Sequence, residues 1–281
     1  MNAPLRDRDL QRMDGLARVG VVGRDGGTFL ADLYQRSPGK AMFPRIDGKD
    51  CREVVFLNTA GGIAGGDRLH YQLTAGDGAT ITATTQAAER VYRAIGEPGR
   101  VATHIEARGD ATVEWLPQET IVFERGRLDR ETHIHCDASA RVLAMDWLLL
   151  GRAASGETLR TGEIRDAWRV HRDGRLVWAD AFRLTGDIAG QTARPSLLGG
   201  CAALATILYI AADAEDHLDR ARELLETTSV QTGATVVGGL MICRMACALA
   251  ADLRRAVTTF LRAFRTELAG FPPALPKVWT C

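Results

Sequence analysis

The segment FLNTAGGIAGGDRLHYQL, residues 56–73, holds the densest group of residues that could do chemistry. A phosphate-binding loop needs a lysine and a hydroxyl residue after its last glycine, and a helix whose N-terminus faces the anion. Asp67 and Arg68 follow the last glycine here and a strand pattern comes next, so we do not expect nucleotide binding. Glycines also permit positive φ angles and close backbone packing without any ligand. The glycines in question are Gly61, Gly62, Gly65 and Gly66.

The sequence HIHC offers a second candidate site, because His133 and His135 are two residues apart. Side chains at that spacing share one face of a strand and could hold a metal ion together, whereas Cys136 points to the other face. No further ligand is spaced nearby, so an exposed polar strand face is the favoured interpretation. Cys243 and Cys247 stand in an apolar setting, which is typical of buried core thiols. The chain has no G-x-S-x-G, H-E-x-x-H or C-x-x-C motif, and its residues predict no catalytic site.

Charge and composition argue against two classes of partner. Lys plus Arg equals Asp plus Glu at 35 each, so no overall basic excess is present to neutralise nucleic-acid phosphates. Residues 1–15 carry alternating charges rather than an export signal, and the longest apolar run, residues 201–212, is too short to cross a bilayer. We therefore expect a cytoplasmic protein that binds neither nucleic acid nor membrane. Six scattered cysteines are expected to be reduced: Cys51, Cys136, Cys201, Cys243, Cys247 and Cys281.

Strands must position these residues, because residues 18–184 have the pattern of a β protein. RLHYQLTA, residues 68–75, alternates apolar and polar side chains with the period of a half-buried strand. Turn signals rich in Gly and Asp recur at short spacing without a helical stripe between them, so βαβ units are not expected. AGDGATITAT (75–84) and RGDATVEWL (108–116) share a turn and a strand roughly 32 residues apart. Stacked β-layers would produce this repeat, and so would ordinary hairpins.

The last third of the chain has helical periodicity. Residues 212–228 predict one helix, with Asp213 as its N-cap. Residues 251–270 predict a second helix with a continuous apolar stripe, ended by Gly270. A strand or hairpin is expected between the helices, at residues 229–247, and three prolines exclude a helix from the tail. The residues thus predict one β-rich domain with two C-terminal helices.

Several segments resemble, in order and spacing, the urease accessory protein family UreD, which is called UreH in some systems. The resemblance spans about residues 18–279 and leaves the first 16 residues out. It implies a mainly β fold, a β-helix-like stack of strands with two C-terminal helices. We therefore expect a flexible segment at 1–16 and a single domain at 17–281, with a β body to about residue 212 and a helix-containing part at 213–281. The matching segments are FLNTAGGIAGGDRL (56–69), TTQAAERVYRA (84–94), EWLPQETIVFERGRL (114–128), residues 148–184 and LPKVW (275–279).

The resemblance implies a maturation factor and not an enzyme. Members of the family act with UreF and the GTPase UreG to load nickel into apo-urease, and two copies often stand in the full complex. Nickel is thought to pass through a water-filled tunnel in the protein, so we expect nickel in transit and no tightly bound cofactor.

Four carboxylates match polar tunnel positions of the family: Asp67, Glu89, Asp146 and Asp180. A conduit needs binding that permits both entry and exit, which favours sparse oxygen ligands over a dense cage of cysteine or histidine. Each carboxylate also has a structural interpretation. Asp67 could cap its own glycine turn, and Glu89 could pair with Arg90 or Arg93. Asp146 and Asp180 stand in apolar surroundings, which calls for either a salt bridge or a wet channel.

Other positions bear on partners. The loop at 150–158 resembles a family motif, in which Arg152 and Glu157 could meet a partner or form an internal salt bridge. Residues 251–279 could contact UreF, or bury their apolar stripe in the core of the chain itself. The glycines beside Asp67 are expected to let the backbone fold tightly where a regular element would block the passage.

Two alternatives remain open at this point. One is a metal-dependent enzyme that uses Asp67, Asp146 and the pair His133 and His135. The other is an adaptor that joins UreF to urease without conducting metal.

Overall fold

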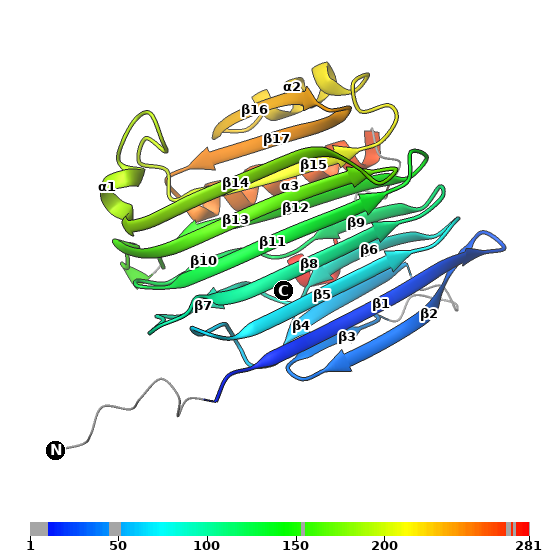
Figure 1. The fold of residues 1–281 in the computed structure, drawn as a ribbon. Helices are drawn as coiled ribbons and strands as arrows, with labels where there is room; N and C mark the ends of the chain where they lie inside the picture. The colour runs from blue at the N-terminus through cyan, green and yellow to red at the C-terminus, as the bar shows by residue number, and fades with distance from the viewer. Residues whose placement is uncertain (1–10, 45–51, 153–154, 268–270, 272–273, 281) are drawn as a thin grey trace.

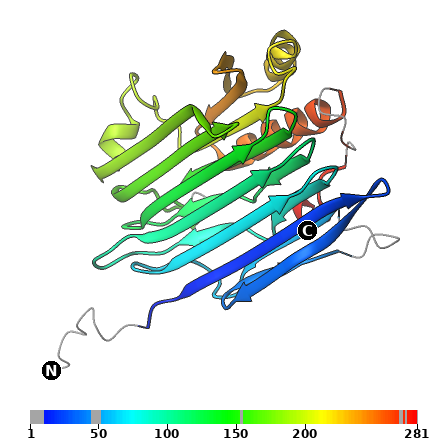
Figure 2. The ribbon, with the colours of Figure 1, turned by 45° about the vertical axis from the view of Figure 1, so that its right-hand side comes forward.

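The computed structural model describes residues 11–44, 52–152, 155–267, 271 and 274–280. Two β-sheets stack face to face, and the longest helix lies against the outer side of the second sheet (Figures 1 and 2). Sheet A has seven strands in the order β14 (Arg175–Asp187), β13 (Thr161–Arg172), β11 (Arg127–Cys136), β8 (Gly99–Ala107), β5 (Arg68–Ala75), β1 (Asp14–Arg24) and β2 (Gly27–Arg36).

Sheet B has ten strands, and the chain crosses between the two sheets again and again. Its main path is β16 (Gln231–Val237), β17 (Leu240–Cys247), β15 (Ala203–Ile210), β12 (Arg141–Leu150), β9 (Thr112–Leu116), β6 (Thr80–Thr85), β4 (Glu53–Asn58) and β3 (Gly39–Met42). Two short strands extend it, because β10 (Thr120–Val122) pairs with both β12 and β7 (Glu89–Val91).

The central strands are parallel, and each layer of the stack repeats the one before it. β6 and β9 pair in a register that joins Thr80 to Thr112, 32 residues later. β5 and β8 pair with the same offset, from Arg68 to Arg100. The repeat seen at 75–84 and 108–116 is therefore a pair of stacked layers and not two hairpins, and the expected β-helix-like stack is confirmed.

Buried and exposed side chains alternate along β5 of sheet A, and this alternation is lost along β12 of sheet B. In β5 the side chains alternate between buried and partly exposed, as the sequence predicted. In β12 nearly every side chain is buried, because sheet B is the middle layer between sheet A and the helices. This position explains the apolar run around Asp146, since both faces of that strand are covered.

Two C-terminal helices are confirmed. The structure also has a short third helix, earlier in the chain, that the sequence did not predict. α2 (Leu218–Glu226) and α3 (Ala250–Glu267) lie in the expected regions, and β16 and β17 form the expected hairpin between them. α1 (Ile188–Thr192) follows β14 directly, where Asp187 accepts a hydrogen bond from Gly190 N–H. No helix within the described ranges is long and apolar enough to span a membrane.

Three details of the helical region differ from the predictions. α2 begins at Leu218 and not beside Asp213, whose carboxylate instead binds the Arg141 guanidinium 2.9 Å away. The tail holds one turn of 3-10 helix, η3 (Lys277–Trp279), because the last proline, Pro276, precedes it and can start a turn. The expected stop at Gly270 lies outside the described residues. At the other end β1 begins at Asp14, inside the segment expected to precede the domain.

Candidate functional site

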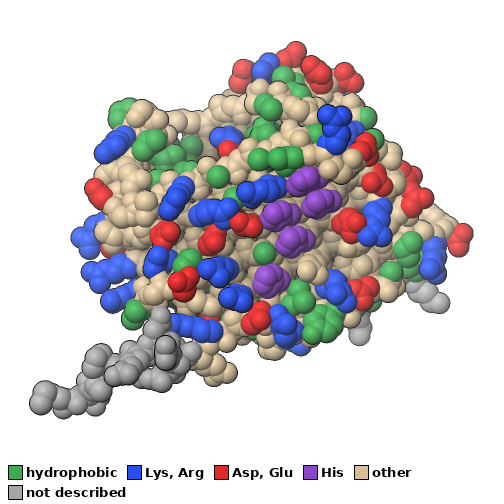
Figure 3. All heavy atoms as spheres, viewed as in Figure 1, with side chains coloured by type: hydrophobic (Ala, Val, Ile, Leu, Met, Phe, Trp, Pro, Cys, Tyr) green, Lys and Arg blue, Asp and Glu red, His purple; other side chains and the backbone are tan. Residues whose placement is uncertain are grey.

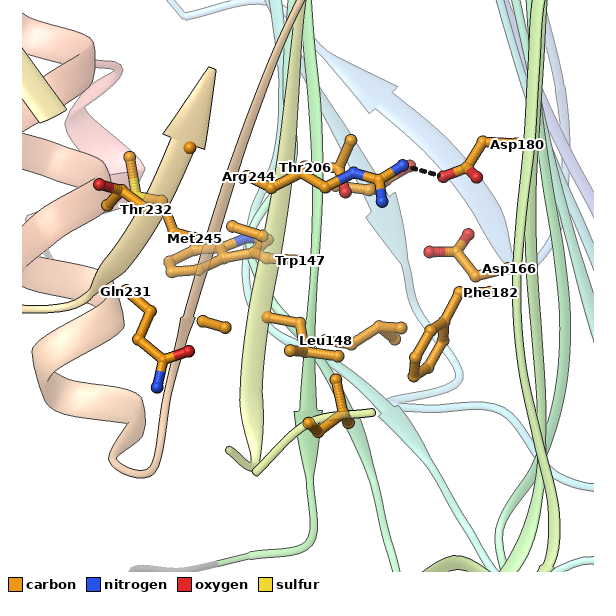
Figure 4. A pocket seen from close by; sticks show the side chains of 16 residues that line it. Trp147, Leu148, Asp166, Asp180, Phe182, Thr206, Gln231, Thr232, Arg244 and Met245 are labelled. Carbon is orange, nitrogen blue, oxygen red and sulfur yellow. Dashed lines mark hydrogen bonds and ion pairs between the residues drawn. The ribbon is translucent and has the colours of Figure 1, made fainter. Parts of the chain in front are cut away.

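A cavity of about 330 Å³ opens between the β13–β14 edge of sheet A and the β12–β15–β17 part of sheet B. Two of the four predicted carboxylates, Asp146 and Asp180, line it together with Asp166. In Figure 4, Asp166 and Asp180 project from the same side of the cavity, and Arg244 reaches toward them from the opposite side. The cavity therefore joins carboxylates of three consecutive strands, β12, β13 and β14, with an arginine of the more distant strand β17.

Asp146 is the innermost of these carboxylates, with only 6% of its surface exposed. One oxygen lies 3.2 Å from the Arg130 guanidinium, and the other accepts a hydrogen bond of 3.0 Å from the Thr132 hydroxyl. Burial raises the pKa of Asp146 to about 6, although Arg130 acts in the opposite direction. The sequence left a salt bridge or a wet channel open, and Asp146 both forms a salt bridge and lines a cavity.

Arg130 lies at the centre of this part of the interior and links the two sheets. Its Nε and Nη2 atoms donate to the two oxygens of Asp166 at 2.9 and 2.7 Å, while Nη1 donates to the Thr120 hydroxyl at 3.0 Å. Burial lowers the pKa of Arg130, but the carboxylates of Asp146 and Asp166 outweigh it and raise that pKa overall. The guanidinium is thus a fully buried cation that neutralises two carboxylates.

Asp180 is the outermost carboxylate of the cavity. Its side chain is 32% exposed, and its Oδ2 lies 2.6 Å from Arg244 Nη2. Exposure of this degree means that the ion pair exchanges with solvent and contributes little stability. Asp180 is therefore free to exchange its partner at the mouth of the cavity.

Glu89 lies at a second, smaller cavity of about 130 Å³. Its side chain accepts a hydrogen bond of 3.1 Å from the Asn58 amide, and burial raises its pKa to about 7. The predicted ion pair with Arg90 or Arg93 is absent from the contacts of the described residues. Arg90 lowers the pKa of Glu89, but burial outweighs it, and Arg93 forms an isolated β-bridge with Gly126.

Glu89 is connected to the first cavity through Thr120. The two residues are partners in the parallel pairing of β7 and β10, so their side chains point to the same face about 5 Å apart. Thr120 in turn accepts the hydrogen bond from Arg130. We call the resulting set the interior polar row: Glu89, Thr120, Arg130, Asp146, Asp166 and Asp180.

Asp67 does not belong to this row. One of its oxygens accepts the Ala64 N–H at 2.7 Å, which closes its own glycine turn, and the other accepts the Met13 N–H at 2.9 Å. The residue lines a different depression beside Tyr92. The turn-capping interpretation describes these contacts, and through Met13 the cap also anchors the start of β1.

The glycines beside Asp67 are required for close packing. A Cβ atom on Gly62 would lie 2.7 Å from the Arg90 carbonyl oxygen, and one on Gly65 would lie 2.8 Å from the Glu97 carbonyl oxygen. Gly61 and Gly66 have φ angles of +77° and +81°, which favour glycine. The loop therefore packs directly against β7 and the segment that follows it, between the cavity of Glu89 and the depression of Asp67.

The loop with Arg152 and Glu157 is held by its own salt bridge. Arg152 Nη2 lies 2.6 Å from a Glu157 oxygen, and the other oxygen of Glu157 accepts the Glu124 N–H at 3.1 Å. The Arg152 hydrogen bond holds the pKa of Glu157 below its ordinary value. The Arg152 guanidinium also lies over the Phe123 ring, 4.3 Å from its centroid. These contacts fit the internal role that the sequence left open beside a partner contact.

The apolar stripe of α3 is buried against sheet B, together with the end of the tail. Leu253, Phe260 and Phe264 are at most 1% exposed, and Trp279 stacks on Trp147 with ring centroids 5.6 Å apart. The stripe is consequently a core feature. Any contact of residues 251–279 with a partner has to use their outer side.

The pair His133 and His135 lies on the outer face of sheet A, and Cys136 is buried on the inner face, as predicted. Three more of the six histidines lie on the same face, so that five cluster across four neighbouring strands (Figure 3). Among the described residues no three metal-binding side chains converge on one point. Cys243 is buried and Cys247 is half-buried, and both are free thiols.

Sequence reasoning missed Arg130, Asp166 and the wider histidine cluster. A signal existed for the first two, because each is in phase with the buried residues of its strand. Arg130 falls between Leu128 and Ile134 on the inner face of β11, and Asp166 falls between Ile164 and Trp168 on that of β13. A charged residue at a strand position where the alternation calls for an apolar side chain marks an interior polar site.

Comparison with known proteins shows the family of this chain. The family model "UreD urease accessory protein" matches residues 13–280. A urease accessory protein UreD of Xanthobacter autotrophicus is 42% identical over 278 residues, covering 99% of this chain and 93% of the relative. Proteins of the same description from Methylobacterium sp. (strain 4-46) and Rhizobium etli are each 41% identical, with 96% of this chain covered and 95% and 96% of the relatives. The chain belongs to the UreD family of urease accessory proteins.

Proposed function

We propose that this protein is a non-enzymatic maturation factor that passes nickel along its interior polar row to apo-urease. In this proposal it works in the cytoplasm as a scaffold between urease and a UreF–UreG complex, with two copies in the full assembly. Nickel is cargo in transit and not a resident cofactor. The observation that carries the proposal is the buried row of oxygen ligands between two cavities, in a chain of this family.

The ligands of the row suit transfer better than storage. Carboxylate and hydroxyl oxygens hold Ni²⁺ less firmly than thiolate or clustered imidazole would, so the ion can leave again. Asp180 is partly exposed, Asp146 is buried, and Glu89 is half-buried at the second cavity, so the ion would pass from a partly exposed ligand through a buried one to a partly exposed one. Asp67 has no place in this path, because both of its oxygens accept backbone hydrogen bonds.

Arg130 determines whether the row can carry a cation. Its guanidinium occupies the position between Asp146 and Asp166 that a divalent ion would take. Two like charges cannot share that position in a buried site, so the ion has to displace the arginine. We infer that contact with a partner protein moves β11 or β13 enough to loosen this network.

The enzymatic alternative gains no support from the geometry. Asp67 lies in a turn, Asp146 lies between the sheets, and His133 and His135 lie on the outer face of sheet A. These residues are distributed over three separate places and form no common site. The adaptor without metal conduction remains the second candidate, because the large sheet surfaces could join partners whatever the interior does.

Neutral isosteres distinguish a protein that conducts nickel from an adaptor that does not. The variant Asp146→Asn keeps the shape of the side chain and removes its charge, and Asp219→Asn, at a position whose side chain is 91% exposed, is the matched control. Each variant is co-expressed with apo-urease, UreF and UreG, and the nickel content of urease and the assembly of the complex are both measured. We expect an assembled complex with nickel loading reduced by about tenfold for Asp146→Asn. Full loading with Asp146→Asn, Asp180→Asn and Glu89→Gln together would favour the adaptor.

A further inference from the structure

Five histidines form a diagonal line across the outer face of sheet A, from β5 to β13 (Figure 3). We call this set the histidine face: His70, His104, His133, His135 and His171. The sixth histidine, His217, precedes α2 elsewhere in the molecule.

The register of β8 and β11 makes a four-cornered arrangement at the centre of this face. His133 is the strand partner of His104, and His135 is the partner of Glu106. Neighbouring strands lie about 5 Å apart, and residues two apart along a strand lie about 7 Å apart, so the corners surround a small area. We call these residues the ligand square: His104, Glu106, His133 and His135.

The rings already lie in contact across the strands. His104 and His133 are stacked with ring centroids 4.9 Å apart, and His135 stacks on His171 at 4.5 Å. Rings stacked in this way do not aim their nitrogens at a shared point, which agrees with the absence of convergent ligands among the described residues. Rotation of the side chains about χ1 and χ2 would bring the nitrogens together; His104 and His135 are exposed and can rotate, whereas His133 is 21% exposed and has to leave its contact with Glu131.

Room for an ion exists next to the square. A shallow depression of about 340 Å³ is lined by His104, Glu106 and His135, with Gln72 and Thr74 of β5 on its far side. The contacts that an ion would displace are weak and exposed. His133 Nε2 lies 3.2 Å from a Glu131 oxygen, and Glu106 pairs with Arg108, whose side chain is 60% exposed.

We propose that the ligand square is a binding site for a divalent ion of the later transition series, such as Ni²⁺, Cu²⁺ or Zn²⁺. Imidazole is a ligand that suits these ions, and Zn²⁺ also accepts a carboxylate beside histidines. Mg²⁺ and Ca²⁺ prefer oxygen ligands and are not expected to bind here. The site lies on the opposite face of sheet A from the interior polar row, so it does not depend on the proposed conduit.

Equilibrium dialysis of the untagged full chain against Ni²⁺ tests this site. The ligand variant His135→Gln is compared with two controls, His70→Gln on the same face and His217→Gln away from it. We expect the wild type to bind one Ni²⁺ per chain. His135→Gln and His104→Gln should abolish this binding or weaken it about tenfold or more, and neither control should affect it. Excess Mg²⁺ should not displace the ion.

Electron paramagnetic resonance of the Cu²⁺ form adds a direct readout of the ligands. Nitrogen hyperfine structure from the imidazoles should be present in the wild type and reduced in His135→Gln. Circular dichroism of each variant establishes that the fold is retained. The proposal is overturned if the ligand variants bind Ni²⁺ as the wild type does, or if His70→Gln weakens binding as much as His135→Gln. Loss of metal only in Asp146→Asn would assign the ion to the interior row instead.

Discussion

The buried arginine between the sheets gives the sharpest prediction about this structure. Replacement of Arg130 by leucine removes hydrogen bonds to Asp146, Asp166 and Thr120, and it leaves two buried carboxylates without their cation. Removing one partner from a buried ion pair costs about 3–5 kcal/mol, and the guanidinium here serves two carboxylates. We therefore expect Arg130→Leu to lower the free energy of unfolding by about 5 kcal/mol at pH 8.

The stability lost in Arg130→Leu should become smaller as the pH falls. Burial already raises the pKa of Asp146, and without Arg130 only the hydrogen bond from Thr132 opposes that rise. The folded variant then binds protons more tightly than the unfolded chain, so it regains stability as the pH falls toward 5.5. Urea unfolding followed by circular dichroism at pH 8 and at pH 5.5 measures both values.

A matched arginine on the other side of the sheet provides the control. Arg165 also binds two carboxylates, Asp129 at 2.7 Å and Glu131 at 2.6 Å, but its side chain is 33% exposed. Arg165→Leu should cost about 1 kcal/mol at most. Adding Asp146→Asn and Asp166→Asn to Arg130→Leu should restore most of the lost stability, since no buried charge then remains unpaired. Equal losses for the two arginine variants would refute the argument that burial makes Arg130 the critical cation.

Two further predictions concern Glu89 and the glycine loop that packs beside it. Burial raises the pKa of Glu89 to about 7 from 4.5, so the folded state holds this proton more tightly, and its contribution to stability is lost as the pH rises between these values. Glu89→Gln should remove that slope, which for a half-buried group is about 2 kcal/mol between pH 5 and pH 8, as measured by urea unfolding. Gly65→Val should lower the free energy of unfolding by about 1–3 kcal/mol, because its Cβ would lie 2.8 Å from the Ala94 Cβ. A Cβ atom on Gly233 would have nothing within 4 Å, so Gly233→Val is the control and should change the free energy of unfolding little.

Local patterns predicted most of the fold. Alternation in β5 and the stripe of α3 are properties of neighbouring residues, and both were confirmed. The repeat 32 residues apart was compatible with stacked layers and with hairpins, and the register of β6 and β9 decides for the layers. The start of α2 was predicted wrongly because Asp213 has a stronger tertiary partner. Its carboxylate binds Arg141 and the Tyr209 hydroxyl, so it is not available to cap a helix. Single-sequence reasoning sees the capping preference and not the distant arginine.

The candidate site was less accessible to sequence reasoning, because parallel strands join residues that are distant in the chain. Family resemblance selected Asp146 and Asp180, which line one cavity, but also Asp67, which caps a turn elsewhere. The phase of Arg130 and Asp166 within their strands could have revealed them. No local signal unites the histidine face, since its members come together only through the register of four strands.

The most direct test of the central claim is the nickel content of urease that matures with and without this chain. Apo-urease, UreF and UreG are co-expressed in both cases, and the purified urease is assayed for bound nickel and for urea hydrolysis. If the chain delivers nickel, urease made without it should contain little nickel and show little activity, and both should return with the wild-type chain. Equal nickel content in the two preparations would contradict a role in nickel delivery.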